Sequence, residues 1–361
     1  MMSFKPLCLP LAAALGFAVV AAAAQVPSDF QPVHEVEKET LRAKLDPALP
    51  LYRPQADPTG NIRVAGNLEH MEPLLKLWIA AYQKLHPGTT FTFDTKHDDS
   101  GKAIPAMVEG ATDLTLIGRE MKDAEIATFQ KKYGYPPFIV SISAGSFRVH
   151  GKSFAPVFFV NKENPLTQVS LDQLDGIYSK TRRRGSPEIT TWGQLGVTGP
   201  WATKPIHLYG LDPAAGTRTY LKVRLLKDGD WKDGIKTSKY EDGEADWTEL
   251  VNFVGDDPLG IAYASAGHTI WNPKVKNLRL SEHNGGPYVP ATFANVADQH
   301  YPLSRFVFLL LNRKPGTPVD PKVKEFLEFI YSKQGQECVI DEGDYLPLAA
   351  DIAMENRRKL D

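Results

Sequence analysis

Cysteine is scarce in this chain of 361 residues, which contains only Cys8 and Cys338. Cys8 begins an apolar run and does not lie at the end where cleavage would occur, which argues against a lipid-anchored cysteine. A single remaining thiol cannot form an intramolecular disulfide. No cluster of cysteine and histidine with metal-ligand spacing accompanies Cys338, so we interpret it as a structural thiol and predict no metal site.

Long apolar runs are also missing after the first residues. Lys5 precedes an apolar run at residues 7–20, which is followed by four alanines ending at Ala24. This pattern is typical of an export signal, and cleavage after Ala24 would leave Gln25 at the N-terminus. The run is shorter than the roughly 20 apolar residues of a membrane span. We therefore expect residues 1–24 to be a cleaved signal peptide and the mature protein to be a soluble protein of the periplasm.

A charge excess of either sign is absent, because the formal net charge is -2 with 23% charged residues. Nucleic-acid-binding proteins concentrate lysine and arginine to neutralise phosphates, so we expect no nucleic-acid partner. The short basic run at residues 180–184 is interpreted as a solvated loop. The composition, 42% hydrophobic, is that of a globular protein, which we expect to be a monomer.

The signatures of the common catalytic sites are missing as well. The chain has no G-x-S-x-G elbow, no P-loop and no HExxH motif. Asp98 and Asp99 follow His97, but adjacent residues rarely converge on one ion, so a turn with a helix-capping acid is the better interpretation. The acidic stretch at residues 241–246 is interpreted as a solvated loop. We therefore expect no enzyme activity and no cofactor.

What the chain does contain is an alternation of strand and helix patterns from Asn61 onward. This alternation is typical of an α/β fold with a largely parallel sheet. The roughly 335 residues left after cleavage exceed what one hydrophobic core usually serves, so we expect two lobes, with the second unit beginning near Ala155. Residues 25–60 are rich in proline and are interpreted as an N-terminal extension with one short helix across residues 36–45.

Three junctions between a strand and a helix have the composition of ligand-binding turns: residues 66–70, 98–102 and 212–218. The N-terminus of a helix carries unsatisfied N–H donors and partial positive charge, so such junctions suit small oxyanions. Taken singly, each junction is better explained as an ordinary turn followed by a capped helix.

The order of several segments along the chain carries more information than any one of them. Ser100-Gly101-Lys102 is followed by residues 113–122, 189–192, 210–220, 260–263 and 301–305, and a C-terminal part extends to residue 348. Over residues 61–348 this succession resembles the phosphate-binding proteins of ABC importers.

The resemblance implies a type II periplasmic-binding-protein fold. This is an α/β fold with two lobes, each a mixed sheet flanked by helices, and a hinge between them. Residues 61–150 plus 286–361 would form lobe 1, and residues 151–285 lobe 2. It also implies a function: the protein would capture phosphate or a related oxyanion in the cleft between the lobes and deliver it to the permease of an ABC importer, with hinge closure on binding.

When the ligand-binding positions of the family are mapped onto this sequence, several residues differ from the family pattern. Gly66-Asn67-Leu68-Glu69 lacks the usual hydroxyls and introduces a carboxylate, and Ile117 and Gly118 stand where serines are usual. Leu211 replaces an arginine and Ala215 a serine, which removes two side-chain donors from that loop. The ligand-binding residues that the resemblance implies are Asn67, Leu68, Ser100, Gly101, Arg119, Ala215, Gly216 and Thr217.

Three cations are candidates to replace the missing arginine: His70, Lys102 and Arg218. Each has a structural alternative, because all three side chains can also face solvent, and for His70 this is the better interpretation since the sequence shows no partner for it. Ser100 has the alternative of capping its helix, and Arg119 that of pairing with a carboxylate such as Glu120 or Asp123. Two alternative functions stay open: binding of a different small solute, and an interaction, adhesion or signalling role with a degenerate cleft.

Overall fold

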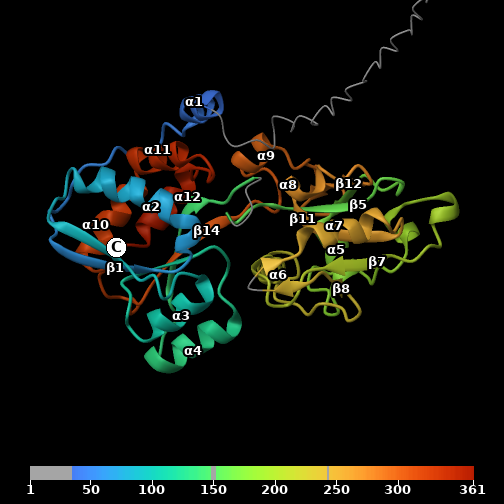
Figure 1. Ribbon diagram of the computed structural model, residues 1–361, viewed down its shortest axis with the longest axis horizontal. Helices are drawn as coiled ribbons and strands as arrows, with labels where there is room; N and C mark the ends of the chain where they lie inside the picture. Colours follow the sequence, from blue (N-terminus) through green and yellow to red (C-terminus); the bar gives the residue numbers. More distant parts are fainter. Residues whose placement is uncertain (1–34, 148–151, 242–243) are drawn as a thin grey trace, which may run out of the picture.

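The computed structural model describes residues 35–147, 152–241 and 244–361, arranged as two bodies side by side (Figure 1). The predicted signal peptide and the beginning of the N-terminal extension lie outside the described residues. Among the residues that are described, no helix is both long enough and apolar enough to cross a membrane.

The first body is built on a mixed sheet of five strands in the order β2-β1-β3-β14-β4. The strands β1, β2 and β3 are parallel, whereas β14 runs antiparallel to both β3 and β4. The strands are β1 (Gly60–Ala65), β2 (Thr89–Phe93), β3 (Leu114–Ile117), β4 (Phe138–Ala144) and β14 (Phe306–Leu311). The last of these arrives from far along the chain, so the C-terminal part completes this sheet.

The helices of the first body bury one apolar stripe each. In α2 the predicted spacing is observed, because Leu74, Leu75, Trp78 and Tyr82 are all buried along one face. The helices are α1 (Glu35–Lys44), α2 (Leu68–Gln83), α3 (Ser100–Val108), α4 (Asp123–Tyr133), α10 (Pro321–Ile330), α11 (Lys333–Glu342) and α12 (Ala350–Arg358).

The second body contains another mixed sheet, in the order β12-β5-β11-β7-β8. The strand β11 pairs antiparallel with β5 and parallel with β7. Both sheets are therefore mixed, as the family resemblance implies, and not largely parallel as the alternation of elements alone predicted. The strands are β5 (Pro156–Asn161), β7 (His207–Gly210), β8 (Lys236–Thr237), β11 (Gly260–Ser265) and β12 (Val275–Asn277).

Short elements surround this second sheet. The helix predicted after Ser170 is observed as α5, and the Ser170 hydroxyl accepts a hydrogen bond from the N–H of Gln173 at 3.0 Å. The remaining helices are α5 (Leu171–Tyr178), η2 (Trp192–Leu195), η3 (Gly199–Trp201), α6 (Gly216–Arg224), α7 (Trp247–Gly255), α8 (Ala266–Thr269) and α9 (Phe293–Ala297). Two small ribbons pair β6 (Gln168–Ser170) with β13 (Arg279–Ser281), and β9 (Tyr240–Glu241) with β10 (Glu244–Ala245).

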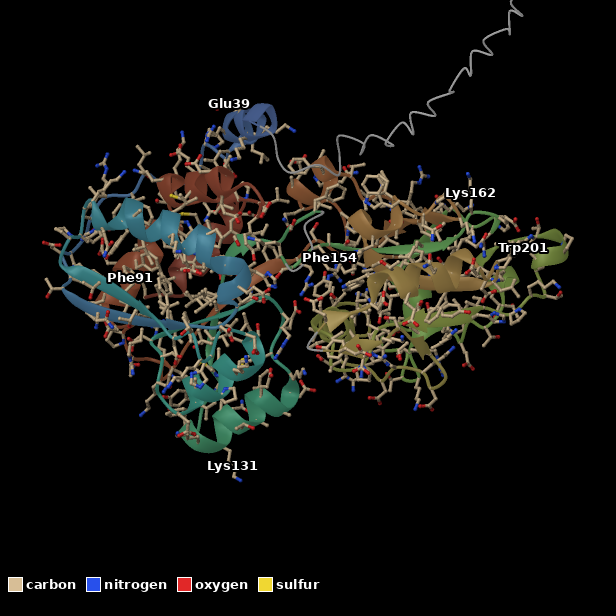
Figure 2. All side chains as sticks on the ribbon, in the orientation of Figure 1. Glu39, Phe91, Lys131, Phe154, Lys162 and Trp201 are labelled. Carbon is tan, nitrogen blue, oxygen red and sulfur yellow. The ribbon has the colours of Figure 1, made fainter. Side chains whose placement is uncertain are left out.

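Two segments carry the chain between the bodies. The first follows β4 and precedes β5, with residues 145–147 and 152–155 described, and the second, residues 298–305, leads from α9 back to β14. The two crossing segments are hydrogen-bonded to each other through the N–H of Gly145 and the carbonyl of Arg305, at 2.7 Å. A side chain at Gly145 would lie 2.1 Å from the Ser153 carbonyl oxygen, so only glycine fits there. Phe154 of the first crossing segment lies between the two bodies (Figure 2).

The described part of the N-terminal extension packs on the first body. Its short helix is α1, close to the predicted bounds. Leu45, Leu49 and Tyr52 are buried, and the Tyr52 hydroxyl donates to the carboxylate of Glu325 in α10 at 2.7 Å. Residues 45–59 therefore contribute to the core of this body.

Candidate functional site

A cavity of about 620 Å³ lies between the two bodies. The first body contributes the starts of α2 and α3 and the turn after β3, and the second contributes the start of α6 and the ribbon of β9 and β10. All three junctions that the sequence singled out therefore reach one cavity. The residues of the first crossing segment that line it are Ser153 and Phe154, and that of the second is Arg305.

Most of the predicted ligand-binding residues line this cavity. Leu68 does not: its side chain is buried, and its N–H donates to the Asp98 carbonyl at 2.8 Å. Asn67 begins α2 in a left-handed conformation (φ 42°), and its Nδ2 has no hydrogen-bond partner among the described residues. The residues brought together are Asn67, Ser100, Gly101, Arg119, Ala215, Gly216 and Thr217.

The N-terminus of α6 presents uncommitted backbone donors to the cavity. The chain turns after β7, where the Asp212 carboxylate accepts from the N–H of Ala214 at 2.8 Å, and Ala215 takes the N-cap position in extended conformation. Alanine has no side-chain acceptor, so no side chain caps this helix. The N–H groups of Gly216 and Thr217 belong to the first turn, so they have no acceptor within the helix, and they lie at its positive end.

The N-terminus of α3 is different, because Asp99 caps it. The Asp99 carboxylate accepts from the N–H groups of Gly101 at 2.7 Å and of Lys102 at 2.9 Å. Burial opposes ionisation of Asp99, but hydrogen bonds from Lys102 and from these N–H groups leave its pKa below the ordinary value. The Ser100 hydroxyl oxygen lies 3.4 Å from the N–H of Gly118, which leaves its own hydrogen for another acceptor.

Arg119 follows β3 and lies against the start of α6. A Cβ placed on Gly216 would be 3.6 Å from the Cδ of Arg119, so the two bodies are in van der Waals proximity here. The guanidinium donates to both carboxylate oxygens of Glu125, at 2.9 and 2.7 Å. The sequence suggested Glu120 or Asp123 as the partner, and Glu125 is the carboxylate found. This pairing fixes the orientation of the Arg119 guanidinium and neutralises part of its charge.

The three candidate replacement cations have different surroundings. His70 and Lys102 line the cavity, and Lys102 forms ion pairs with Asp98 at 3.0 Å and Asp99 at 2.9 Å. Arg218 does not line it: its guanidinium donates to the Leu211 carbonyl and lies 5.0 Å from the centre of the Trp231 ring. Arg218 therefore supports the fold of the second body.

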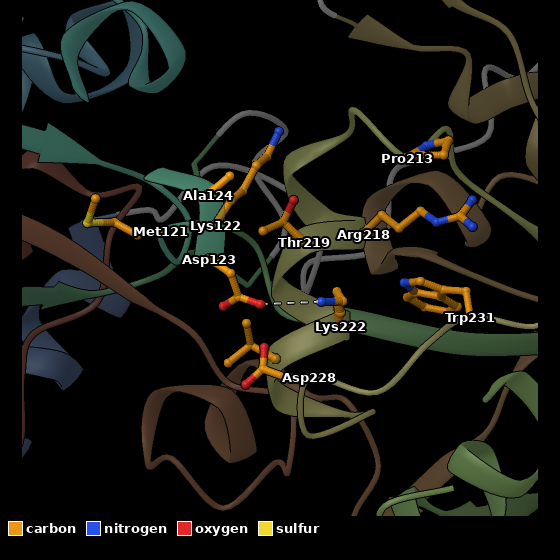
Figure 3. A pocket seen from close by; sticks show the side chains of 11 residues that line it. Met121, Lys122, Asp123, Ala124, Pro213, Arg218, Thr219, Lys222, Asp228 and Trp231 are labelled. Atoms are coloured by element: carbon orange, nitrogen blue, oxygen red, sulfur yellow. Dashed lines mark ion pairs between the residues drawn. The ribbon is translucent and has the colours of Figure 1, made fainter. Parts of the chain in front are cut away.

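Arg218 and Trp231 lie instead in a neighbouring groove of about 460 Å³ between α4 and α6 (Figure 3). Across this groove Lys222 and Asp123 form an ion pair at 3.7 Å, which joins the two bodies (Figure 3). Both side chains are exposed or nearly so, and an ion pair of this kind contributes little to stability.

Sequence reasoning missed several residues of the site, above all Arg305 and Ser153. Both donate to the Gly118 carbonyl, Arg305 from Nη2 at 2.8 Å and Ser153 from its hydroxyl at 2.7 Å. A Cβ on Gly118 would lie 2.8 Å from the Ser153 hydroxyl and 2.9 Å from Asn67 Nδ2, so the glycine makes room for both groups. Residues 301–305 were a landmark of the resemblance, but nothing in the sequence indicated that Arg305 reaches the cavity. Tyr240 and Trp247 of the second body were missed as well.

Comparison with known proteins settles the family. Residues 53–334 match the PBP superfamily domain. The phosphate-binding protein PstS of Pseudomonas aeruginosa strain PAO1 is 33% identical over 319 residues, which cover 88% of this chain and 92% of that protein. This chain belongs to the PBP superfamily, in the same family as that phosphate-binding protein. The family resemblance recognised in the sequence is thereby confirmed.

Solved structures of the superfamily agree on the fold. PstS of Borrelia burgdorferi superposes with a TM-score of 0.50 at 20% identity, covering 80% of this chain and 98% of that one. The predicted fold class, two lobes with mixed sheets flanked by helices, is therefore confirmed. Among residues 35–147, 152–241 and 244–361, no group of three histidine, cysteine or acidic side chains is placed to hold a metal ion.

Proposed function

We propose that this protein captures phosphate reversibly in the cavity between its lobes and delivers it to the permease of an ABC importer. The observation that carries the proposal is the uncapped N-terminus of α6, which faces the same cavity as Ser100 and Arg119. Converging N–H donors and cationic groups suit a tetrahedral oxyanion. The name of the P. aeruginosa relative, at 33% identity, supports phosphate as that anion.

Within the cavity, we assign the anion contacts to the N–H groups of Gly216 and Thr217 and to the hydroxyls of Thr217 and Ser100. The Nδ2 group of Asn67, which has no hydrogen-bond partner in the part of the chain that the structure describes, is a further donor. Gly101 and Ala215 shape the wall, and Leu68 holds the first turn in place. An anion that leaves one of these buried donors unpaired binds more weakly, which is how the site would discriminate between solutes.

The proposal includes the domain organisation and the hinge. Lobe 1 comprises residues 61–144 and 306–361, lobe 2 comprises residues 156–297, and the described parts of the two crossing segments absorb the closure of the lobes around the ligand. The lobes already approach each other at Arg119 and Gly216 and at the ion pair of Asp123 with Lys222.

The proposed setting is the periplasm, where the protein acts as a monomer without enzyme activity. The apolar run at residues 7–20 with its alanine-rich end supports export. The cavity is lined by donors and paired charges and offers no nucleophile with a positioned base, which supports capture without chemistry.

Calorimetry on ligand-stripped protein tests the proposal. The protein is unfolded in guanidinium, dialysed and refolded, and then titrated with phosphate and, separately, with sulfate. We expect saturable binding of one phosphate per chain and a higher melting temperature with phosphate, because a ligand that binds only the folded state stabilises it. Absence of any response to phosphate would overturn the proposal. A different molecule released on denaturing the purified protein, identified by mass spectrometry, would assign the cavity to another solute.

A further inference from the structure

Arg305 occupies an unusual place in the molecule. It is the last residue of the second crossing segment, immediately before β14, and its side chain is among those that line the cavity. Only 5% of its surface is exposed. Burial lowers the pKa of its guanidinium below the ordinary value, against the opposing influence of Glu120. A group that stays charged is therefore held where water hardly reaches it.

The hydrogen bonds of Arg305 do not use its donors fully. Nη2 donates to the Gly118 carbonyl at 2.8 Å, and the guanidinium lies 4.5 Å from the centre of the Tyr220 ring. The Nε–H group is buried and has no acceptor among the described residues. An arginine presents five N–H donors in a planar fork, so a buried guanidinium with this few acceptors is incompletely satisfied.

Two other cations beside the cavity, Arg119 and Lys102, are better neutralised. Arg119 is paired through two hydrogen bonds with Glu125, and Lys102 forms ion pairs with Asp98 and Asp99. Arg305 forms no hydrogen bond to a carboxylate within the described ranges. A buried cation without a bound anion is costly, and an anion placed beside it removes that cost.

Glu120 is the carboxylate whose charge acts on Arg305 most directly, but it is a weak partner. Burial raises the pKa of the Glu120 carboxyl above its ordinary value, although Arg305 opposes this shift. Its Oε2 has no hydrogen-bond partner among the residues the structure describes. Glu120 therefore does not take the place of an anion bound to the arginine.

We propose that Arg305 is a ligand-binding residue whose Nε–H and guanidinium charge compensate the charge of an oxyanion bound in the cavity. This inference rests on the proposed function and adds a contact from the crossing segment. Arg305 also touches both lobes, through the Gly118 carbonyl in the first and the Tyr220 ring of α6 in the second. An anion held by Arg305 therefore ties the crossing segment to the helix that carries Gly216 and Thr217.

Phosphate titrations of three proteins test the proposal: the wild type, Arg305→Met and a matched control, Arg313→Met. Arg313 follows the other end of β14, is half-buried away from the cavity, and donates to the carbonyls of Thr317 and Asp361, each at 2.7 Å. We expect Arg305→Met to lose about 10- to 100-fold in phosphate affinity, as for the loss of hydrogen bonds to a charged group. Arg305→Lys keeps the charge without the fork and is expected to lie between the wild type and Arg305→Met. The control is expected to stay within about twofold of the wild type.

A second pair of measurements separates binding from folding. The double variant Glu120→Gln, Arg305→Met removes both buried charges, so its melting temperature without ligand should be closer to the wild type than that of Arg305→Met. We expect its phosphate affinity to stay low. Recovery of the affinity together with the melting temperature would show that Arg305 acts only on the fold and would overturn the proposal.

A direct spectroscopic signal completes the test. The Nε–H resonance of Arg305, assigned by its loss in Arg305→Lys, should shift on titration of the wild type with phosphate, whereas that of Arg313 should not. A wild type that binds no phosphate contradicts the proposed function itself. A wild type that binds phosphate together with an Arg305→Met variant of equal affinity contradicts only the role of Arg305.

Discussion

The starts of α3 and α6 face each other across the cavity and are built in opposite ways. Each helix has nine residues, and each begins directly after a turn that the sequence singles out. The Asp99 carboxylate occupies two N–H groups of α3 and also pairs with Lys102. Ala215 leaves the first N–H groups of α6 without a cap. Only one of the two helix starts therefore keeps its donors and its positive end for an anion.

The uncapped helix is held at its other end. Arg224 in the last turn of α6 donates to Glu282 at 3.0 Å and to the Pro302 carbonyl at 2.9 Å. The Tyr220 hydroxyl donates to the Ser304 carbonyl at 3.2 Å. A missing N-cap typically costs a helix about 1 kcal/mol, and these contacts offset that cost. The comparison shows that α6 lacks a stabilising cap at its N-terminus, which faces the ligand. The helix is instead held by contacts of residues further along it, Tyr220 and Arg224.

The largest effect is expected from Ala215→Asp, which gives α6 an aspartate at its N-cap like that of α3 and so removes the difference between the two helix starts. The new carboxylate would accept from the N–H groups of Thr217 and Arg218, the second and third residues of the helix, and add negative charge where the anion binds. We expect phosphate affinity to fall by about 100-fold or more, because charged hydrogen bonds are lost and repulsion is added. The helix itself should gain about 1 kcal/mol. Calorimetry and urea denaturation measure the two effects.

Ala349→Asp is the matched control for that substitution. Ala349 is the N-cap of α12, has a similar extended backbone (φ −65°, ψ 151°) and also provides no side-chain cap. The carboxylates of Asp46 and Asp351 already accept from N–H groups at the start of α12, at 3.1 and 2.8 Å, so we expect no gain in stability there and no loss of phosphate binding. If Ala215→Asp bound phosphate as well as the wild type, the start of α6 would not be the anion site.

A finer test uses two threonines of the same helix. Thr217 lines the cavity, whereas Thr219 lines the neighbouring groove of Figure 3, and both are largely buried. We expect Thr217→Val to weaken phosphate binding by about tenfold, the value of one hydrogen bond to a charged ligand, and Thr219→Val to leave it nearly unchanged. Equal losses in the two variants would indicate an effect on the helix and not on a ligand contact.

The parts of this site that could be predicted from sequence are those set by local rules. The starts of α3 and α6 follow from turn residues and capping preferences within a few positions, and Asp99 was expected as a capping acid. The apolar stripe of α2 follows from helical spacing. The order of such segments along the chain was enough to indicate the family and its two-lobed fold.

The parts that could not be predicted depend on long-range packing. Arg305 and Ser153 reach the cavity because two crossing segments, far apart in sequence, are hydrogen-bonded together and both contact Gly118. The mixed strand order arises because β14 inserts between β3 and β4 from the far end of the chain. The pairing of Arg119 with Glu125 depends on the path of the chain between β3 and α4, which composition does not reveal.

The opposite change, removal of the cap of α3, tests whether the start of that helix also acts on the anion. Asp99→Ala removes the cap, frees the N–H groups of Gly101 and Lys102, and releases Lys102 from one ion pair. We expect phosphate affinity to rise by about two- to fivefold, the range expected of a helix N-terminus acting on a nearby anion. The free energy of unfolding should fall by about 1 kcal/mol. Unchanged or weaker binding in a folded Asp99→Ala variant would show that α3 does not face the anion.

The smallest effect on phosphate binding is expected from Glu282→Gln, which weakens the contact between Glu282 and Arg224 in the last turn of α6. Burial opposes ionisation of Glu282, but hydrogen bonds from Arg224 and Arg184 lower its pKa to about 2 from an ordinary 4.5. Because the folded-state pKa is depressed, the contribution to stability is present above about pH 4.5 and is lost as the pH falls toward 2. With partial exposure to solvent, we expect the variant to be about 1 kcal/mol less stable than the wild type at pH 7. The difference should shrink through that acid range, while phosphate affinity at pH 7 changes by less than about twofold. Urea denaturation at several pH values measures the stability difference between the wild type and Glu282→Gln. Glu355→Gln, on the surface of α12, is the control. A stability difference that does not vary with pH would contradict the role given to Glu282.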